Sequence, residues 1–254
     1  MLLTRVIPIL LLDGDALVKT HRFKSPRYLG DPINAVTIFN EKEVDEIVLL
    51  DISATNEARE PNFDLIADIA SQAFMPFSYG GGITSMEHIR RLFSIGVEKV
   101  VLNGINFHSF DLIREAAQVY GRQSIVGAID INKTLFGKYV VCSNSAKTKH
   151  SASPVEWAQS LEAAGVGELI ITSVDRESTF EGYDVAMMKQ VADAVGIPVV
   201  ANGGAAELKH FEEVKREAKV SAVAAGSMFV YHGKHRAVLI TYPSVSDLEN
   251  VFGE

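Results

Sequence analysis

The sequence predicts a (β/α)8 TIM barrel, and three observations lead to this fold class. Short apolar runs rich in β-branched residues alternate with amphipathic segments along the whole chain. Eight such runs are candidate strands, each followed by a candidate helix, which is typical of parallel strands joined by crossover helices. The length of 254 residues suits eight such units closed into one barrel.

The elements follow one another in a regular order. The candidate strands lie at residues 5–12, 46–51, 76–79, 99–102, 124–130, 168–172, 198–201 and 220–224. The clearest helix follows the third strand, where Met86, Ile89, Leu92 and Phe93 recur at helical spacing and Gly96 ends the pattern. An open doubly wound sheet is the rival fold, but no G-x-G-x-x-G motif follows the first strand. No linker-like tract divides the chain, so we expect one domain over residues 1–254.

The two halves of the chain repeat each other at an offset of 122 residues. Three pairs of identical residues share this offset: Glu46 with Glu168, Gly81 with Gly203, and His88 with His210. The segments around them also match, as SYGGGITSMEHI does with ANGGAAELKHF. Repetition of this kind indicates duplication of a structural unit. We therefore expect two half-barrels, at about residues 1–122 and 123–254, each with four strand–helix pairs.

The composition limits the class of protein. The net charge of −8 and the absence of a basic stripe argue against a nucleic-acid partner. The lone cysteine, Cys142, excludes a disulfide framework and a cysteine-based metal site, and it suits a reducing cytoplasm. The apolar run VIPILLL is too short to span a membrane and lacks a basic leader. We expect a cytoplasmic protein with no membrane segment, no metal and no cofactor.

The first and fifth strands carry different residues at corresponding positions. Asp130 ends the fifth apolar run, whereas the matching residue of the first is Leu11. The carboxyl ends of the strands carry the chemistry in such barrels, so Asp130 is a candidate catalytic or metal-binding carboxylate, with helix capping as the plainer alternative. Asp51 and Thr172 lie on the same face, where Asp51 either takes part in the chemistry or orients nearby loops. Lys19 lies in a long polar loop, KTHRFKSPRYLGDP, of the kind that forms substrate lids.

Glycine-containing turns follow the third, fourth, seventh and eighth strands. Glycine lets backbone N–H groups approach a phosphate closely, and the turns after strands seven and eight are the usual phosphate site of these barrels. The repeat adds a second site after strands three and four, which predicts an elongated substrate with a phosphate at each end. The plainer alternative is that the glycines only permit tight turns. The candidates are Gly81, Gly82, Asn103 and Gly104 in the first half, and Gly203, Gly204, Gly226 and Ser227 in the second.

Specific motifs resemble one family over nearly the whole chain. They are VKT, GDP, DEIVLLDISAT, PFSYGGGI, EKVVLN, AIDIN, GELIITSVDR, GYD and VVANGGA. The sequence resembles the cyclase subunit of imidazole glycerol-phosphate synthase. That resemblance implies a glutaminase partner docked on the N-terminal face of the barrel and ammonia that crosses the barrel core. It also implies a bisphosphorylated ribotide substrate, which ammonia converts to imidazole glycerol phosphate and an aminoimidazole carboxamide ribotide.

The resemblance also implies which residues act, and here the chain departs from the family pattern. The family uses one aspartate on strand one and one on strand five, which correspond to Leu11 and Asp130. Lys19 of the VKT motif is implied as a catalytic residue. The family's phosphate loop after strand six reads Asp-Gly-Thr, but residues 177–179 read Glu-Ser-Thr, so only Thr179 matches. Because leucine cannot exchange a proton, loss of the first acid–base group is expected to cost about 10²–10⁴-fold.

A ring of charges that the family uses as an ammonia gate is kept. Its members are Arg5, Glu46, Lys99 and Glu168, and each lies at the start of a candidate strand. Charges at strand starts are also compatible with a solvated rim. Four alternating charges on one ring favour a closed cluster of salt bridges instead. We therefore expect a gate at the N-terminal end of the barrel.

The chain keeps the residues for receiving ammonia and has an altered catalytic face. In this it is similar to a paralogous branch of the family found in bacterial surface-polysaccharide gene clusters. This similarity implies a glutaminase and a separate sugar amidotransferase as partners, in a system that makes acetamidino sugars. Three alternatives stay open. They are a working histidine-pathway cyclase that uses Asp13 or Asp130 alone, a non-enzymatic activator of a glutaminase, and the sister sugar-phosphate isomerase. The isomerase has no need for an ammonia gate, so the four charges argue against it.

Overall fold

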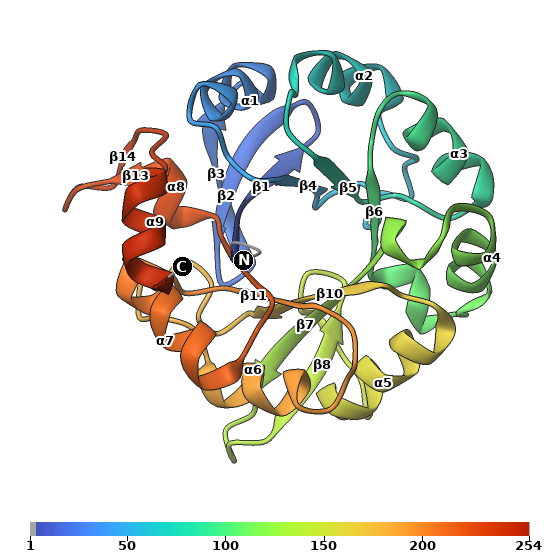
Figure 1. Cartoon of the computed structure of the whole chain (residues 1–254). Helices are drawn as coiled ribbons and strands as arrows, with labels where there is room; N and C mark the ends of the chain where they lie inside the picture. Colours follow the sequence, from blue (N-terminus) through green and yellow to red (C-terminus); the bar gives the residue numbers. More distant parts are fainter. Residues whose placement is uncertain (1–3, 254) are drawn as a thin grey trace.

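A closed barrel of eight parallel strands forms the centre of the computed structural model, which describes residues 4–253 (Figure 1). The strands follow the chain around the barrel, and pairing of the fifth with the sixth and of the eighth with the first closes it. The predicted fold class is confirmed, with all eight predicted strands present. They are β1 (Arg5–Asp13), β4 (Ile47–Asp51), β5 (Phe77–Gly80), β6 (Lys99–Leu102), β7 (Ile125–Lys133), β10 (Glu168–Ser173), β11 (Val199–Asn202) and β12 (Ala222–Ala225).

Helices surround the barrel, because each crossover buries an amphipathic helix against the strands (Figure 1). Capping side chains fix where several of the helices begin. Ser85 caps α3 by accepting a hydrogen bond from the His88 N–H at 3.2 Å, and Ser153 and Glu156 form a capping box on α5. The helices are α1 (Pro32–Glu41), α2 (Phe63–Gln72), α3 (Met86–Ser94), α4 (Asp111–Tyr120), α5 (Pro154–Ala164), α6 (Val185–Ala192), α7 (Leu208–Ala218), α8 (Ser227–Val230) and α9 (Val245–Phe252), with short 3₁₀ turns η1 (Gly104–Phe107) and η2 (Arg122–Ser124).

The apolar residues form two separate layers. Alternate residues of each strand face opposite sides of the sheet, so Val6, Leu10 and Leu12 of β1 pack under the helices whereas Ile9 and Leu11 point into the barrel. The inner layer is small and aliphatic. Besides Ile9 and Leu11 it contains Ile7, Val18, Val48, Val101, Val126, Ala128, Ile170, Val200, Ala222 and Ala224. The barrel interior is therefore a packed apolar column, as expected for this fold.

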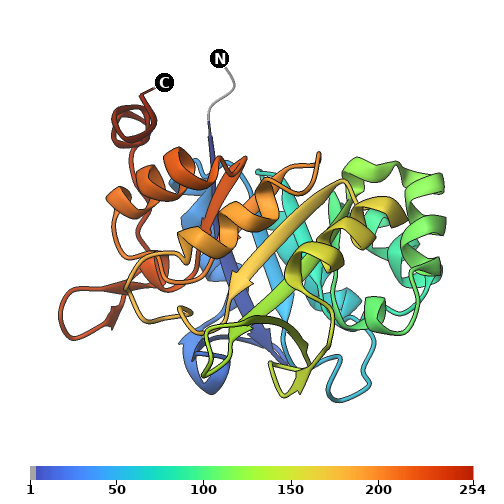
Figure 2. The same cartoon turned by 90° about the horizontal axis from the view of Figure 1, so that it is seen from below.

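Two β-hairpins extend the barrel at the carboxyl ends of the strands, opposite both chain termini (Figure 2). One consists of β2 (Ala16–His21) and β3 (Lys24–Gly30), and the other of β8 (Tyr139–Ser143) and β9 (Thr148–Lys149). The segment read from the sequence as a polar lid loop is thus largely an antiparallel ribbon. The difference arises because Leu17 and Val18, directly before this segment, are both buried and begin β2, and pairing with β3 continues the ribbon into the segment.

Strand register supports the correspondence between the two halves. Leu11 of β1 lies opposite Leu50 of β4, and Asp130 of β7 lies opposite Thr172 of β10. Leu50 and Thr172 are themselves separated by the 122-residue offset. Leu11 and Asp130 therefore hold matching positions on the first strand of each half.

The C-terminal segment adds a short hairpin, β13 (Tyr231–His232) with β14 (Ala237–Val238), before α9. Tyr242 ties this segment to the barrel, since its hydroxyl donates to the carbonyl oxygen of Val6 at 2.8 Å. Within residues 4–253, none of the helices is both long enough and apolar enough to cross a membrane.

Candidate functional site

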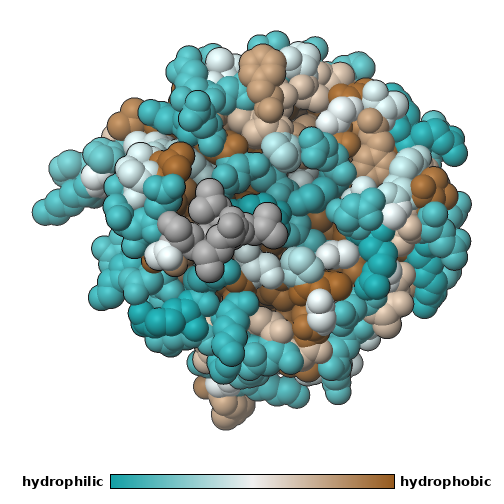
Figure 3. Space-filling model, viewed as in Figure 1, coloured by the Kyte–Doolittle hydropathy of each residue, from teal (hydrophilic) through white to brown (hydrophobic). Residues whose placement is uncertain are grey.

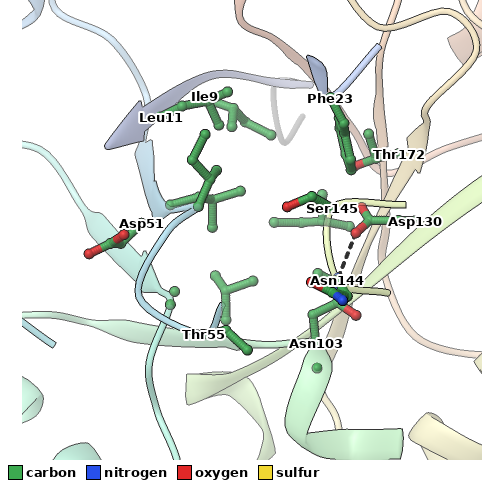
Figure 4. A pocket seen from close by; sticks show the side chains of 18 of the residues that line it. Ile9, Leu11, Phe23, Asp51, Thr55, Asn103, Asp130, Asn144, Ser145 and Thr172 are labelled. Atoms are coloured by element: carbon green, nitrogen blue, oxygen red, sulfur yellow. Dashed lines mark hydrogen bonds between the residues drawn. The ribbon is translucent and has the colours of Figure 1, made fainter. Parts of the chain in front are cut away.

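A cavity opens at the carboxyl ends of the strands, where barrels of this class carry their chemistry (Figure 4). It encloses about 180 Å³. Its floor is aliphatic and consists of the inner-layer residues Ile9, Leu11, Val101, Ala128 and Ile170. Polar groups from several strand ends and from both hairpins form its walls.

Leu11 and Asp130 approach this cavity from opposite sides (Figure 4). Both line it, so the structure brings together the two positions that the sequence comparison paired. Asn103 Nδ2 donates to Asp130 Oδ2 at 2.8 Å. Leu11 offers only methyl groups. The site therefore has an acid–base group at Asp130 and none at the facing position, Leu11.

The protein environment changes the proton affinity of Asp130. Burial raises the pKa of this carboxyl to about 7, against the opposing hydrogen bond from Asn103 and with an added contribution from the negative charge of Glu177. A group with a pKa near neutrality exchanges protons readily in both directions. Asp130 is thus suited to general acid–base chemistry.

Asp51 and Thr172 also line the cavity, but both side chains are engaged in local hydrogen bonds. Asp51 Oδ1 accepts from the backbone N–H groups of Ser53 and Ala54 at 3.0 and 2.9 Å, and Arg59 lies 3.4 Å from Oδ2. Thr172 Oγ1 accepts from Asn202 Nδ2 at 3.1 Å. These contacts favour the loop-orienting interpretation of Asp51 over a catalytic one.

The phosphate candidates divide into two groups. Those of the first half, Gly81, Gly82, Asn103 and Gly104, all line the cavity. Gly81 has a φ of 121°, and a Cβ there would lie 2.4 Å from the carbonyl oxygen of Asp51, so only glycine fits. Those of the second half, Thr179, Gly203, Gly204, Gly226 and Ser227, are absent from the cavity wall.

Lys19 lies at the edge of this second group, buried rather than solvated. Its ammonium forms an ion pair with Glu177, and both residues are only about 5% exposed. Ser178 continues the contact, since its hydroxyl donates to the carbonyl oxygen of Thr20 at 2.7 Å and lies 2.6 Å from the hydroxyl of Ser227. The predicted catalytic lysine is therefore paired with a carboxylate of the sixth-strand loop.

The four gate candidates meet at the opposite end of the barrel. Arg5 contacts Glu46 at 2.6 Å and also pairs with Glu168, while Lys99 lies 2.9 Å from Glu46 and 3.0 Å from Glu168. The ring alternates in charge and is closed. Burial alone would raise the pKa of Glu168, but the hydrogen bond from Arg5 and the nearby cations hold this pKa below its usual value.

This end of the molecule is the face seen in Figure 3. Hydrophilic residues cover most of it, with apolar residues exposed between them. A surface of mixed character is usual for contacts between proteins that also exist apart. The charged ring thus lies at an end of the barrel whose surface is of mixed character.

Some lining residues were not predicted from the sequence. Asn144 and Ser145, at the turn between β8 and β9, reach over the cavity, as do Thr20 and Phe23 of the first hairpin. Thr20 Oγ1 has no hydrogen-bond partner among the described residues. The Ser-Asn-Ser cluster that follows the β-branched run at residues 139–141 is a turn signal. Over residues 4–253, no cluster of His, Cys, Asp and Glu is arranged to hold a metal ion.

Comparison with known proteins agrees with this geometry. The family model described as "Histidine biosynthesis protein" matches residues 5–236. A Pseudomonas aeruginosa protein named "Putative imidazole glycerol phosphate synthase subunit hisF2" is 51% identical over 245 residues, which cover 96% of this chain and 98% of that protein.

Two further relatives have similar names. A Leptospira interrogans protein, named as the subunit HisF of the same synthase, is 42% identical over 99% of this chain and all of its own length. A Vibrio vulnificus protein, named as subunit hisF3, is 42% identical over 97% of this chain and 95% of its own. Full-length similarity of this degree, on a barrel with the same motifs, shows that the chain belongs to the cyclase-subunit family of imidazole glycerol phosphate synthase, whose members work with a glutaminase subunit.

Proposed function

We propose that this barrel receives ammonia from a glutaminase docked on its N-terminal face and passes it to the opposite end for an amidation reaction. The acceptor we favour is an activated sugar whose N-acetyl group becomes an acetamidino group during surface-polysaccharide synthesis, with a separate sugar amidotransferase as a further partner. The observation that carries this proposal is a contrast. The charged ring is complete, whereas the acid–base pair has lost one member at Leu11.

The interior between the two ends suits such a route. Small aliphatic side chains separate the ring from the cavity, with Ile7 and Ala224 among those in the middle of the barrel. Neutral ammonia enters an apolar column at a far smaller cost than ammonium, which must also give up the hydration of a full charge. The ring of charges at one end and the apolar column behind it together favour transfer of the neutral form.

A second function is favoured by Asp130. Its pKa of about 7 suits the proton transfers of ring closure. A cyclase that relies on Asp130 alone would make imidazole glycerol phosphate and an aminoimidazole carboxamide ribotide, as in histidine biosynthesis. The two functions differ in one requirement, because the cyclase must process the bisphosphorylated ribotide and the ammonia carrier need not.

Cyclase turnover with ammonium salt in place of a partner separates the two functions. We expect wild-type protein to be inactive on the formimino ribotide and Leu11→Asp to gain activity on the order of 10²–10⁴-fold over it. Leu11→Asn is the matched control, since asparagine has nearly the same size as aspartate and is also polar, but it cannot act as an acid or a base. Wild-type turnover near 1 s⁻¹ or more, an ordinary enzymatic rate, would establish the cyclase instead.

Ammonia transfer is tested at the ring. With a purified glutaminase of the synthase family, Arg5→Ala should change the fraction of ammonia that reaches the cavity end relative to the fraction released to solvent. The control is Arg90→Ala, because Arg90 pairs only with Glu87 on the exposed surface of α3. If glutamine hydrolysis is stimulated equally by wild type and Arg5→Ala and all ammonia escapes in both, the chain is an activator and not a conduit.

A further inference from the structure

We propose that the protein binds anionic lipid surfaces through the turn between β7 and β8. In this contact Leu135 and Phe136 enter the headgroup region, and the lysines of the same hairpin contact the lipid phosphates. The turn, named the tip, consists of residues 134–138. The inference goes beyond the proposed function, because it uses neither the charged ring nor the cavity.

The two apolar side chains of the tip are exposed to their full extent. Phe136 is 99% exposed and Leu135 completely so, and they are the most exposed large apolar side chains within residues 4–253. Single apolar residues on a protein surface are common and need no explanation, and Phe74 is one on this molecule. An adjacent leucine and phenylalanine at full exposure are costly in water. They therefore favour contact with an apolar phase outside the molecule.

The tip projects from the molecule. Figure 1 shows the chain between β7 and β8 extending beyond the ring of helices. A specific contact between two proteins usually buries about 800 Å² on each partner, which is more than one short turn offers. Binding to a lipid surface depends instead on the apolar area that enters it and on the charge beside that area. A protruding apolar pair with cations around it suits this second kind of partner.

Hydrogen bonds hold the tip in one shape. The Thr134 N–H donates to the carbonyl oxygen of Lys138 at 2.8 Å, and the Gly137 N–H donates to that of Thr134 at 2.9 Å. Gly137 has a φ of 80°, a conformation that favours glycine. Beyond the tip, the Tyr139 hydroxyl donates to Asp184 Oδ1 at 2.9 Å and fastens β8 to the start of α6. The apolar pair is thus already ordered, which lowers the cost of binding.

The charge of this hairpin has one sign. Residues 131–155 contain four lysines and neither aspartate nor glutamate, although the whole chain has a net charge of −8. Each lysine near an anionic membrane strengthens binding, and the attraction acts only within a Debye length of about 8–10 Å. The hairpin is therefore attracted to anionic lipids while the rest of the molecule is not, which orients the tip toward the surface. The four lysines are all exposed, and they are Lys133, Lys138, Lys147 and Lys149.

Carboxylates near the base of the hairpin are engaged in local contacts. Asp175 accepts a hydrogen bond from the Lys133 N–H, and Asp184 accepts the one from Tyr139. Both are half-buried on the barrel side of the hairpin. They hold the hairpin to the barrel and leave the lysine side chains to contact lipid phosphates.

Vesicle sedimentation with the whole chain tests the inference. The probes are vesicles of phosphatidylcholine alone and of phosphatidylcholine mixed with phosphatidylglycerol. We expect wild type to bind the mixed vesicles far better than the neutral ones, and less as salt is raised. Leu135→Ser with Phe136→Ser should lower the partition coefficient by about 10–100-fold. The matched control is Phe74→Ser, which should bind as wild type does, since Phe74 is 88% exposed but lies between α2 and β5 at the amino ends of the strands.

Tryptophan fluorescence locates the contact. Trp157 is the one tryptophan of the chain, and the wild type supplies its background. Phe136→Trp places a second indole at the tip, and its emission should shift to the blue with the mixed vesicles as the ring leaves water. Phe74→Trp should show no such shift. This measurement decides even if the double serine variant does not fold, which circular dichroism checks.

Three results would overturn the inference. Failure of wild type to bind the mixed vesicles at low salt would leave another protein as the occupant of the tip. Equal binding by wild type and by Leu135→Ser with Phe136→Ser would place the lipid contact elsewhere. A wild-type dimer in sedimentation velocity that the double variant dissociates would assign the tip to a second copy of the chain. None of these readouts involves ammonia or a ribotide, so the outcome does not depend on the proposed function.

Discussion

At the carboxyl ends of the strands, the two halves of the barrel have similar backbones but different side chains. Both have glycine turns after their third and fourth strands and a hairpin after their first strand. The first half carries Leu11 and glycine turns that line the cavity, whereas the second carries Asp130, glycine turns that do not line it, and Glu177, which pairs with Lys19. The acid–base group and the glycine turns at the cavity thus lie in different halves.

This difference shows that a glycine pattern reports backbone geometry and does not report whether the turn lines the cavity. Gly81 and Gly203 both have positive φ, of 121° and 98°, and both lie against the carbonyl oxygen of a strand-end residue. Their conformations alone would predict two equal sites. The structure nevertheless places Gly81 on the cavity wall and Gly203 away from it.

The largest effect on the stability of the folded protein is expected from Glu177→Ala. The change leaves Lys19 as a buried cation without a partner, which typically costs about 3–5 kcal/mol. We expect the free energy of unfolding, measured in urea, to fall by this amount. The corresponding change in the first half, Thr55→Ala, removes an exposed side chain and should alter it by less than about 0.5 kcal/mol.

A double variant provides the control for this interpretation. Lys19→Met with Glu177→Leu replaces the pair by apolar side chains of similar volume, which is often neutral for stability. Stability close to wild type in the double variant, with a large loss in Glu177→Ala, would assign the loss to the unpaired charge. Equal losses in both would instead assign it to packing.

Much of this architecture could be predicted from the sequence, because the signals are local and periodic. The eight strands follow from β-branched runs, α3 follows from apolar residues at helical spacing, and the ring positions follow from charges at strand starts. The correspondence of Leu11 and Asp130 followed from the repeat. These features depend on neighbours in the sequence, or on the regular geometry of one fold.

The remaining features depend on contacts between distant segments. The pairing of Lys19 with Glu177 joins residues 158 positions apart, so nothing near Lys19 indicates that it is neutralised. The same holds for Thr20 and Ser227, which both contact Ser178. The first hairpin was read as a loop because its turn-forming residues, such as Pro26, outweigh its short apolar stretch in the sequence. These long-range side-chain contacts therefore required the three-dimensional structure.

An intermediate effect, dependent on pH, is expected from Asp130→Asn. The pKa of Asp130 is about 7 in the folded protein and about 3.8 in the unfolded chain. Below the unfolded value both states are protonated, and as the pH rises the unfolded state loses its proton first, so wild type is progressively destabilised until the pH passes 7. We expect the free energy of unfolding of Asp130→Asn, relative to that of wild type, to rise by about 2–3 kcal/mol as the pH goes from 5 to 8.

The first half again gives the comparison, since Leu11→Asn adds the same amide at the matching position without removing an ionisable group. Its stability should run parallel to that of wild type over the same pH range. Urea unfolding at several pH values measures both variants. A constant difference between Asp130→Asn and wild type would mean that the folded pKa of Asp130 is not raised.

The smallest effect is expected from Ser178→Ala, compared with Asn56→Ala at the corresponding place of the first half. Loss of the Ser178 hydroxyl leaves the carbonyl oxygen of Thr20 and the hydroxyl of Ser227 without this buried partner, which costs about 1–3 kcal/mol. Asn56 is exposed, and its contacts to Ile52 and Ser145 are replaced by water, so less than about 0.5 kcal/mol should be lost.

Hydrogen exchange gives this last comparison a local readout. The Arg22 amide, which donates to Glu177, should lose protection in Ser178→Ala because the hairpin is then tied to the sixth-strand loop by fewer contacts. The same amide should be unaffected in Asn56→Ala. Equal protection in both variants would mean that the Lys19–Glu177 pair alone holds the first hairpin to the sixth-strand loop, and that the Ser178 hydroxyl adds nothing to this contact.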